Sequence, residues 1–146
     1  MMRGGPSQED IRRHNLGTLL RFVHLRGPAS RATLAESLGL NRSTIMALTA
    51  DLTAAGLVRE ELPRGPGRRA GRPSLVVRPE STRVYVLAFE VGVDRLVVAR
   101  VGLGGVILDR REGVRARGSD PAELLSVLVA AARSLVRKAE RDAVCV

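Results

Sequence analysis

One stretch, residues 31–52, constrains the fold of this chain more than any other: RATLAESLGLNRSTIMALTADL. The small Ala35 stands where two packed helices must approach each other closely, and Gly39 stands where a short turn needs a positive φ. Ile45 and Leu48 follow at helical spacing and are expected to hold the second helix against the core. These offsets together predict a helix-turn-helix, the motif that places its second helix in the DNA major groove. A generic pair of core helices is the alternative, because such pairs share the Leu and Ala periodicity.

The flanking residues predict where these helices begin and end. Ser30 and Asn41 are typical N-cap residues, because a short polar side chain there accepts a hydrogen bond from a free backbone N–H. Gly56 is expected to end the second helix, as Gly39 ends the first. Apolar residues also recur at helical spacing between Gln8 and Leu25, and they predict a further helix before the motif.

Two strand patterns follow the motif, at residues 57–62 and 75–78, and a Gly-, Pro- and Arg-rich loop joins them at residues 63–73. Three helices followed by such a hairpin predict an α+β winged helix-turn-helix over residues 8–80. Residues 1–7 have no periodicity and are expected to form a disordered tail.

The outer face of the second helix is expected to enter the major groove. On a wheel of ~100° per residue, this face carries Ser43, Met46, Ala47 and Ala50, with Arg42 and Thr44 beside it at the first turn. Arg42 is expected to reach a guanine or a phosphate, and Ser43 and Thr44 to donate to phosphates. Met46, Ala47 and Ala50 offer only packing against thymine methyl groups. The alternative is that Arg42 and Thr44 merely solvate the start of the helix.

The loop at residues 63–73 supplies the positive charge that the helix lacks. Its four arginines project from a backbone kept slim by glycines and stiffened by prolines, which suits the narrow minor groove of A·T tracts. Gly71-Arg72-Pro73 resembles the core of AT-hook peptides. A solvated, flexible linker is the alternative interpretation. The complete set of predicted DNA contacts is Arg31, Asn41, Arg42, Ser43, Thr44, Ala47, Arg64, Arg68, Arg69 and Arg72.

The charge of the chain favours the same partner. The formal net charge is +9, and 23 of the 24 basic residues are arginine. Residues 1–80 hold 13 arginines against 7 acids, whereas residues 81–146 hold 11 basic residues against 8 acids. The positive excess therefore lies mainly in the first half, and it indicates a polyanion such as double-stranded DNA as the partner.

The second half reads as three strands and a helix. The strand patterns span residues 84–91, 96–103 and 106–111, and Gly104-Gly105 suits a tight hairpin turn between the last two. Asp120-Pro121 then combines an N-cap with a proline at the first helical position. An antiparallel sheet of this kind leaves an edge unpaired, which favours pairing between copies of the chain.

Other classes of protein find little support in the sequence. The longest uncharged apolar stretch, Val84–Phe89, is far shorter than the ~20 residues of a membrane span, and residues 1–25 have no apolar signal region. Cys145 is the only cysteine, and His14 and His24 have no third ligand nearby, so neither a disulfide nor a metal site is expected. These features predict a cytoplasmic protein without a membrane partner.

The sequence GPASRATLAESLGLNRSTIMALTADLTAAGLVRE, with Asn15 before it and Gly71-Arg72-Pro73 after it, resembles the N-terminal winged helix of ROK (repressor, open reading frame, kinase) family repressors. The likeness extends over residues 11–146, since LAFEVGVDRLVVARVGLGGVILDRR is similar to the three opening strands of the family's kinase-like domain. The resemblance implies a sugar-responsive repressor that joins a winged helix to an actin-like (ribonuclease H-like) α/β domain. It also implies binding to palindromic operators as a homo-oligomer.

The chain departs from the family pattern in two respects. Residues 90–94 lack the consecutive glycines and the threonine of the family's phosphate loop, and Glu90 and Asp94 are expected to repel an anion there. The chain also ends before the family's catalytic Asp, sugar-contacting residues and zinc motif, and residues 142–146 resemble the start of a further strand. We therefore expect an N-terminal fragment with no catalytic residue, cofactor or metal, and a sugar effector only for a longer chain.

The sequence thus predicts a winged-helix domain (8–80) followed by a truncated actin-like lobe (81–146) of three strands and a helix. The predicted function is sequence-specific regulation of transcription, as a homodimeric repressor of carbohydrate-use genes on a palindromic operator with A·T-rich flanks. Two alternatives remain: a fragment of a ROK-type sugar kinase with a basic extension, and a dimerisation module without effector sensing.

Overall fold

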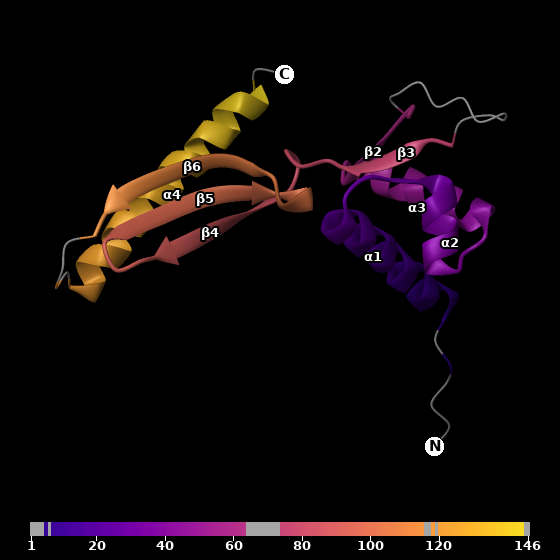
Figure 1. The fold of residues 1–146 in the computed structure, drawn as a ribbon, viewed down its shortest axis with the longest axis horizontal. Helices are drawn as coiled ribbons and strands as arrows, with labels where there is room; N and C mark the ends of the chain where they lie inside the picture. Colours follow the sequence, from indigo (N-terminus) through magenta and orange to yellow (C-terminus); the bar gives the residue numbers. More distant parts are fainter. Residues whose placement is uncertain (1–4, 6, 64–73, 116–117, 119, 145–146) are drawn as a thin grey trace.

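The computed structural model describes residues 5, 7–63, 74–115, 118 and 120–144, and it shows two parts that each hold one small antiparallel sheet (Figure 1). The first part contains α1 (Gln8–Arg26), β1 (Ala29–Ser30), α2 (Arg31–Leu38), α3 (Arg42–Ala54), β2 (Val58–Glu61) and β3 (Val76–Pro79). The second part contains β4 (Tyr85–Val91), β5 (Arg95–Gly102), the 3₁₀ turn η1 (Leu103–Gly105), β6 (Ile107–Val114) and α4 (Pro121–Val144). Among the described residues, no helix is both long and apolar enough to cross a membrane.

The helices of the first part begin at the caps that the sequence predicts. The Ser30 hydroxyl accepts from the Thr33 amide at 3.0 Å, and the Asn41 side-chain oxygen accepts from the Thr44 amide at 2.7 Å. Gly39 follows α2 in the left-handed conformation, with φ +64°. The predicted turn between the two helices of the motif is therefore confirmed.

The core of the first part joins all three helices to the sheet. Its buried residues are Leu19, Val23, Leu34, Ile45, Leu48, Leu52, Val58 and Val77. Ala35 packs against this cluster, which agrees with its predicted place at the helix–helix approach. The winged helix-turn-helix architecture predicted for the first half is thus present in the described residues.

The three strands of the first part run in the order β1-β3-β2, and both pairings are antiparallel. Glu61 and Val76 form the last pair of β2 and β3, so residues 62–75 connect the tip of this hairpin. The strand β1 is not predicted from the sequence, because a strand of two residues has no periodicity. Its backbone nevertheless fixes α2 beside the hairpin through the pairs Ala29↔Val77 and Ser30↔Val76.

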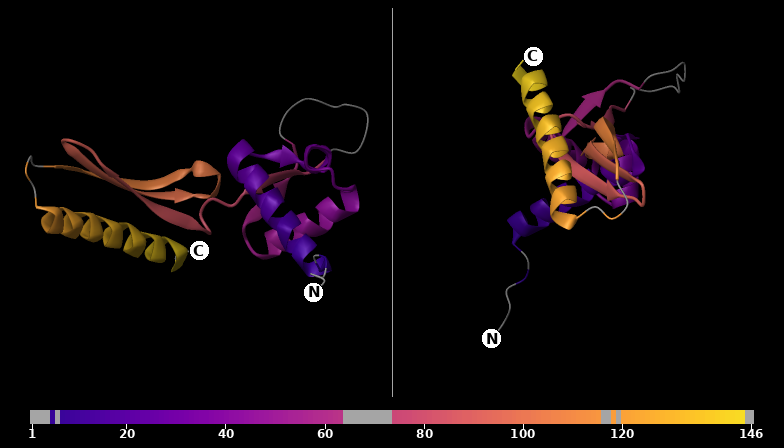
Figure 2. Two further views of the ribbon diagram at one scale, coloured as in Figure 1. Left: turned by 90° about the horizontal axis from the view of Figure 1, so that it is seen from below. Right: turned by 90° about the vertical axis from the view of Figure 1, so that its left-hand side faces the viewer.

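In the second part, α4 lies along one face of the three-stranded sheet, and no described helix covers the other face (Figure 2). Leu96 and Val98 of the central strand β5 pack against Leu128, Ala132 and Leu135 of α4. The strands run in the order β4-β5-β6, all antiparallel, and match the three predicted patterns.

Two details of the second part differ from the prediction. The Gly104-Gly105 connection is the 3₁₀ turn η1 rather than a two-residue hairpin, and both glycines have positive φ (+82° and +75°). Residues 142–144 continue α4 and do not begin a strand, so that prediction is wrong for them. A window of five residues at a chain end was too short to separate a strand pattern from the last turn of a helix.

A buried ion pair of the sheet, Arg100–Asp109, is joined to α4 by the half-exposed Lys138. The Arg100 Nε donates to the Asp109 Oδ2 at 2.8 Å, and Lys138 of α4 donates to the other carboxylate oxygen. The Arg100 and Asp109 side chains are each 9% exposed. Hydrogen bonds from Lys138 first, and from Arg100 second, hold the pKa of Asp109 below its usual value.

The two parts meet where α1 ends and η1 turns. The Gly104 amide donates to the His24 Nδ1 at 2.9 Å, and the Ser81 hydroxyl donates to the Leu103 carbonyl at 2.7 Å. Gly102 lies directly against the Ser81 backbone, where a Cβ would come within 1.9 Å of the carbonyl oxygen. Our domain boundary between residues 80 and 81 stays a prediction, and the two hydrophobic cores lie on either side of it.

Candidate nucleic-acid interface

The outer face of α3 is exposed, as the helical wheel predicts. Arg42, Ser43, Met46, Ala47 and Ala50 are exposed, and Thr44 is half-buried. Ile45, Leu48 and Thr49 point the other way and are buried. The Thr49 hydroxyl donates to the Met46 carbonyl at 3.0 Å, so this buried polar group is satisfied within the helix.

Two hollows flank this helix. One, of about 740 Å³, is lined by Arg31, Ala32, Arg42, Met46, Leu62, Ser74 and Leu75. The other, of about 340 Å³, is lined by Gln8, Ile11, Arg12, Asn15, Thr44, Ala47 and Leu48. Among the described residues, the outer side of α3 is therefore a ridge between two hollows, a shape that suits a helix that enters a groove.

At the start of α3, the polar side chains are already used in capping. The Asn41 Oδ1 accepts from both the Thr44 amide and the Ser43 hydroxyl, each at 2.7 Å. Arg42 has no carboxylate partner among the described residues. Its guanidinium is therefore the cation that this end of the ridge leaves available for a guanine edge or a phosphate.

The structure gives Arg31 a role inside the domain. Its Nε lies 2.5 Å from the Glu60 Oε1, and a second contact joins its Nη2 to the other carboxylate oxygen. The hydrogen bond to Glu60 raises the pKa of Arg31 above its ordinary value. Because Glu60 neutralises this charge and holds α2 to β2, the predicted phosphate contact of Arg31 stays a prediction and competes with an existing ion pair.

The strands of the wing also pair their arginines with acids. The Arg59 Nη1 donates to the Glu80 Oε2 at 2.8 Å, and Arg78 donates to Glu61 across the strand pair. Arg59 first, and then the Thr82 hydroxyl, hold the pKa of Glu80 below its usual value. The four arginines predicted to enter the minor groove, Arg64, Arg68, Arg69 and Arg72, lie outside the described residues.

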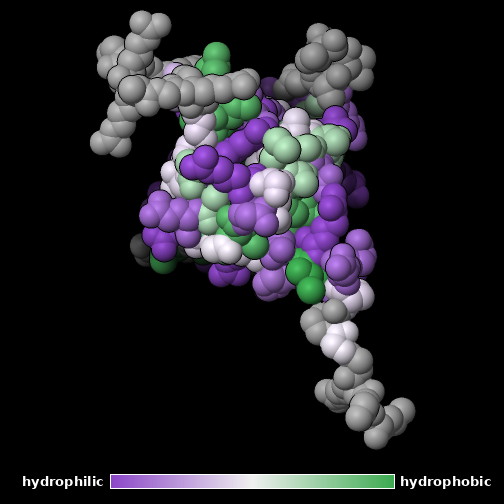
Figure 3. All heavy atoms as spheres, turned by 90° about the vertical axis from the view of Figure 1, so that its right-hand side faces the viewer, coloured by the Kyte–Doolittle hydropathy of each residue, from purple (hydrophilic) through white to green (hydrophobic). Residues whose placement is uncertain are grey.

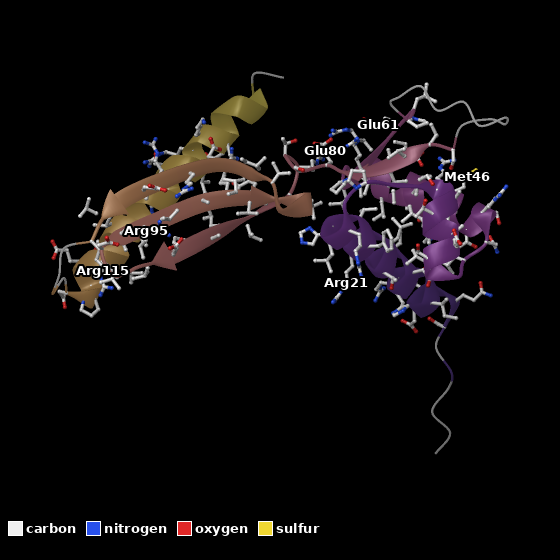
Figure 4. The ribbon with its side chains drawn as sticks, viewed as in Figure 1. Arg21, Met46, Glu61, Glu80, Arg95 and Arg115 are labelled. Atoms are coloured by element: carbon white, nitrogen blue, oxygen red, sulfur yellow. The ribbon has the colours of Figure 1, made fainter. Side chains whose placement is uncertain are left out.

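The surface of this end of the molecule mixes apolar and polar side chains (Figure 3). Met46 lies at the end of the first part that is remote from the second part, as Figure 4 shows. Met46 is 53% exposed and Leu62, which shares a hollow with it, is 68% exposed. The predicted groove-facing surface is therefore less charged than the net charge of the chain implies.

Several residues that line the two hollows are not predicted from the sequence. Gln8 belongs to the first turn of α1, and Leu62 and Ser74 stand at the two ends of the wing connection. They come from segments far apart in the chain, and no local pattern joins them. The Ser74 hydroxyl also accepts from the Ala32 amide at 3.3 Å, which fixes this end of the wing connection beside the start of α2.

The acidic pair expected to repel an anion in the second part is partly neutralised. Arg95 donates to Glu90 at 2.6 Å across the turn between β4 and β5. This hydrogen bond raises the pKa of Arg95 above its ordinary value. Among the described residues, no group of three or more His, Cys, Asp and Glu side chains could hold a metal ion.

The comparisons with known proteins concern both halves of the chain. The family model described as MarR family matches residues 17–69, which hold most of α1, the helix-turn-helix motif and the first strand of the wing. The chain is 30% identical over 129 residues to "Transcriptional regulator Rv0485" of Mycobacterium tuberculosis and, equally, to "Transcriptional regulator Mb0495" of Mycobacterium bovis. The matched region covers 88% of this chain and 30% of each relative.

One solved structure has a similar fold over most of the chain. It is described as a ROK family transcriptional regulator, homologous to the E. coli MLC protein. The TM-score is 0.54 at 22% sequence identity, and the match covers 90% of this chain and 33% of that chain. These comparisons agree with the winged-helix fold and with the coarse prediction of a DNA-binding transcriptional regulator.

Proposed function

We propose that this chain is the DNA-binding portion of a transcriptional regulator. The observation that carries the proposal is the α3 ridge between its two hollows, with Arg42, which has no carboxylate partner among the described residues, at its start. A helix presented in this way fits the major groove, where base edges carry the sequence information. The names of the two mycobacterial relatives support the same function.

In this proposal, α3 enters the major groove with Arg42 and Ala47 toward base edges. Ser43, Thr44 and Asn41 lie at the helix N-terminus, where backbone amides favour a phosphate. Arg31 contacts a phosphate only where that contact outcompetes Glu60. The loop arginines Arg64, Arg68, Arg69 and Arg72 follow the minor groove beside the site.

The finer proposal is a ROK-type repressor of carbohydrate-use genes that binds a palindromic operator as a homodimer. The similar fold of the ROK regulator supports the family, and the sheet with its covering helix supports a partial actin-like lobe after the winged helix. The match covers 30% of the mycobacterial relatives, so sugar sensing is proposed only for a longer protein that includes the remaining regions.

The test begins with selection of bound duplexes from a randomised pool by the full chain. We expect an enriched sequence, and Arg42→Ala should weaken binding to it by about 1–3 kcal/mol if the arginine contacts a guanine. If the contact is to a phosphate, the salt slope should fall by about 0.9 instead. Fluorescence anisotropy at several salt concentrations measures both quantities.

Arg95→Ala is the matched control, because it removes the same charge from an exposed pair in the second part (Figure 4). It should change neither the affinity nor the salt slope by a comparable amount. The proposal fails if no sequence is enriched, or if the two variants bind equally well.

A further inference from the structure

The α3 ridge carries few polar side chains for a surface that reads DNA. The Asn41 side-chain oxygen accepts hydrogen bonds from the Ser43 hydroxyl and from the Thr44 backbone amide. Thr49 is buried, and its hydroxyl donates within the helix. Beyond the first turn, the exposed positions are Met46, Ala47, Ala50, Thr53 and Ala54, and Thr53 is the polar residue among them. Side chains able to hydrogen-bond to base edges therefore lie at the beginning of the helix and at Thr53 in its last turn, and the middle of the exposed face is apolar.

Met46 is the largest side chain of this exposed set. It stands one turn after Arg42 and one turn before Ala50, so the three side chains form one row along the helix. Its side chain borders the hollow that is also lined by Leu62 and Leu75, at the two ends of the wing connection. The row thus passes from a cation to an apolar surface that continues toward the wing.

We infer that Met46, with Ala47 and Ala50 beside it, reads the C5-methyl groups of thymine in the major groove. This inference rests on the proposed function and specifies the chemistry of its readout. The methyl group of thymine is the apolar feature that the major groove presents among its donors and acceptors. A flexible thioether side chain adapts its shape to such a group and excludes water from it.

The inference has a chemical corollary. Uracil presents the same hydrogen-bonding edge as thymine without the methyl, and 5-methylcytosine places a methyl at the equivalent position of a C·G pair. The chain should therefore distinguish thymine from uracil, which a reader that relies on hydrogen bonds alone does not do.

The experiment uses the duplex selected by the full chain, with each thymine replaced singly by deoxyuridine. At the position facing Met46, we expect the affinity to fall about fourfold, which is the loss of about 0.8 kcal/mol for one buried methyl group. In Met46→Ala, the same replacement should change affinity by less than about 1.5-fold, because the reader of the methyl group is absent. Met46→Leu should retain most of the penalty.

Two controls make the outcome specific. Val93→Ala removes another exposed apolar side chain, 76% exposed and in the second part, and should leave the deoxyuridine penalty unchanged. 5-Methylcytosine in place of cytosine within a weakly bound C·G variant of the same position should restore part of the affinity. Thermal unfolding of each variant confirms that the fold is intact.

The possible failures separate the two proposals. If no duplex is enriched, the proposed function itself is overturned. If a duplex is enriched but no deoxyuridine replacement lowers its affinity, sequence-specific binding stands and methyl readout is overturned. Methyl readout by Met46 is also overturned if the full penalty persists in Met46→Ala.

Discussion

Asp109 connects three elements through one carboxylate. It accepts from Arg100 of the neighbouring strand and from Lys138 of α4, and the Arg100 guanidinium also lies 4.9 Å from the centre of the Tyr85 ring. Arg100 is 7% exposed as a residue, so its charge is compensated inside the protein and not by water. Removing the carboxylate would therefore leave a buried cation without its anion.

We predict that Asp109→Asn destabilises the protein by about 3 kcal/mol at pH 7, because breaking a buried ion pair strands its partner. The pKa of Asp109 is lowered in the folded protein, so its contribution is complete above about pH 5 and is lost as the pH falls through the folded pKa. The difference in unfolding free energy between the two proteins should therefore be constant from pH 5 to 8 and shrink below about pH 4. Urea unfolding across this range measures it.

Glu112→Gln is the control for Asp109→Asn. Glu112 pairs with Arg110 on the same sheet, but both side chains are about half exposed (53% and 48%). Water screens such a pair, so the substitution should cost less than about 1 kcal/mol. Equal effects of the two substitutions would show that the cluster around Asp109 is not a buried interaction.

At the scale of the element, the sequence predicted best what is decided locally. Ser30, Asn41 and Gly39 define helix ends by their own chemistry, and the structure confirms all three. The strand β1 was missed because it exists only through pairing with Val76 and Val77, which lie more than 40 residues further along. The hollows beside α3 were missed for the same reason, since Gln8, Leu62 and Ser74 meet only after the chain has folded.

The glycine after α2 offers a test of the predicted turn. Gly39 has φ +64°, and a Cβ there would meet nothing within 4 Å. Gly39→Ala therefore tests backbone strain alone, and we expect it to destabilise the first part by about 1 kcal/mol. That loss corresponds to a melting temperature lower by about 4–8 °C for a domain of this size, which differential scanning calorimetry detects.

Gly17→Ala makes the same chemical change as Gly39→Ala, but it should change the stability in the opposite direction. Gly17 lies within α1, and open space surrounds the position of its Cβ. Because alanine is the better helix former, this substitution should stabilise the first part by about 0.5–1 kcal/mol. If Gly39→Ala raises the melting temperature as Gly17→Ala is expected to do, the left-handed turn assigned to Gly39 is wrong.

At the scale of the whole molecule, two cores are joined by a narrow junction. The cluster around Leu19 and the cluster around Leu96 share no residue. Among the described residues, contact between the parts includes that of η1 with α1, where the Gly104 amide donates to the His24 Nδ1. Within this described part of the chain, this contact and the connection that follows Pro79 are routes by which the second part could influence α3.

Gly102 allows this junction to be tested without touching either core. A Cβ on Gly102 would lie 1.9 Å from the Ser81 carbonyl oxygen, so Gly102→Ala must displace residue 81 or the turn that carries Leu103. We expect the Gly104 amide to lose its hydrogen bond to His24 and to exchange with solvent at least about tenfold faster, the equivalent of about 1.4 kcal/mol of lost protection. Amides of the first core, such as that of Leu48, should keep their exchange rates, because that core does not include the junction.

Gly113→Ala is the control, since nothing lies within 4 Å of its Cβ position, and it should leave the Gly104 amide protected. Hydrogen exchange followed by NMR reports each amide separately, and unchanged protection of Gly104 in Gly102→Ala would show that the two parts do not dock through this turn.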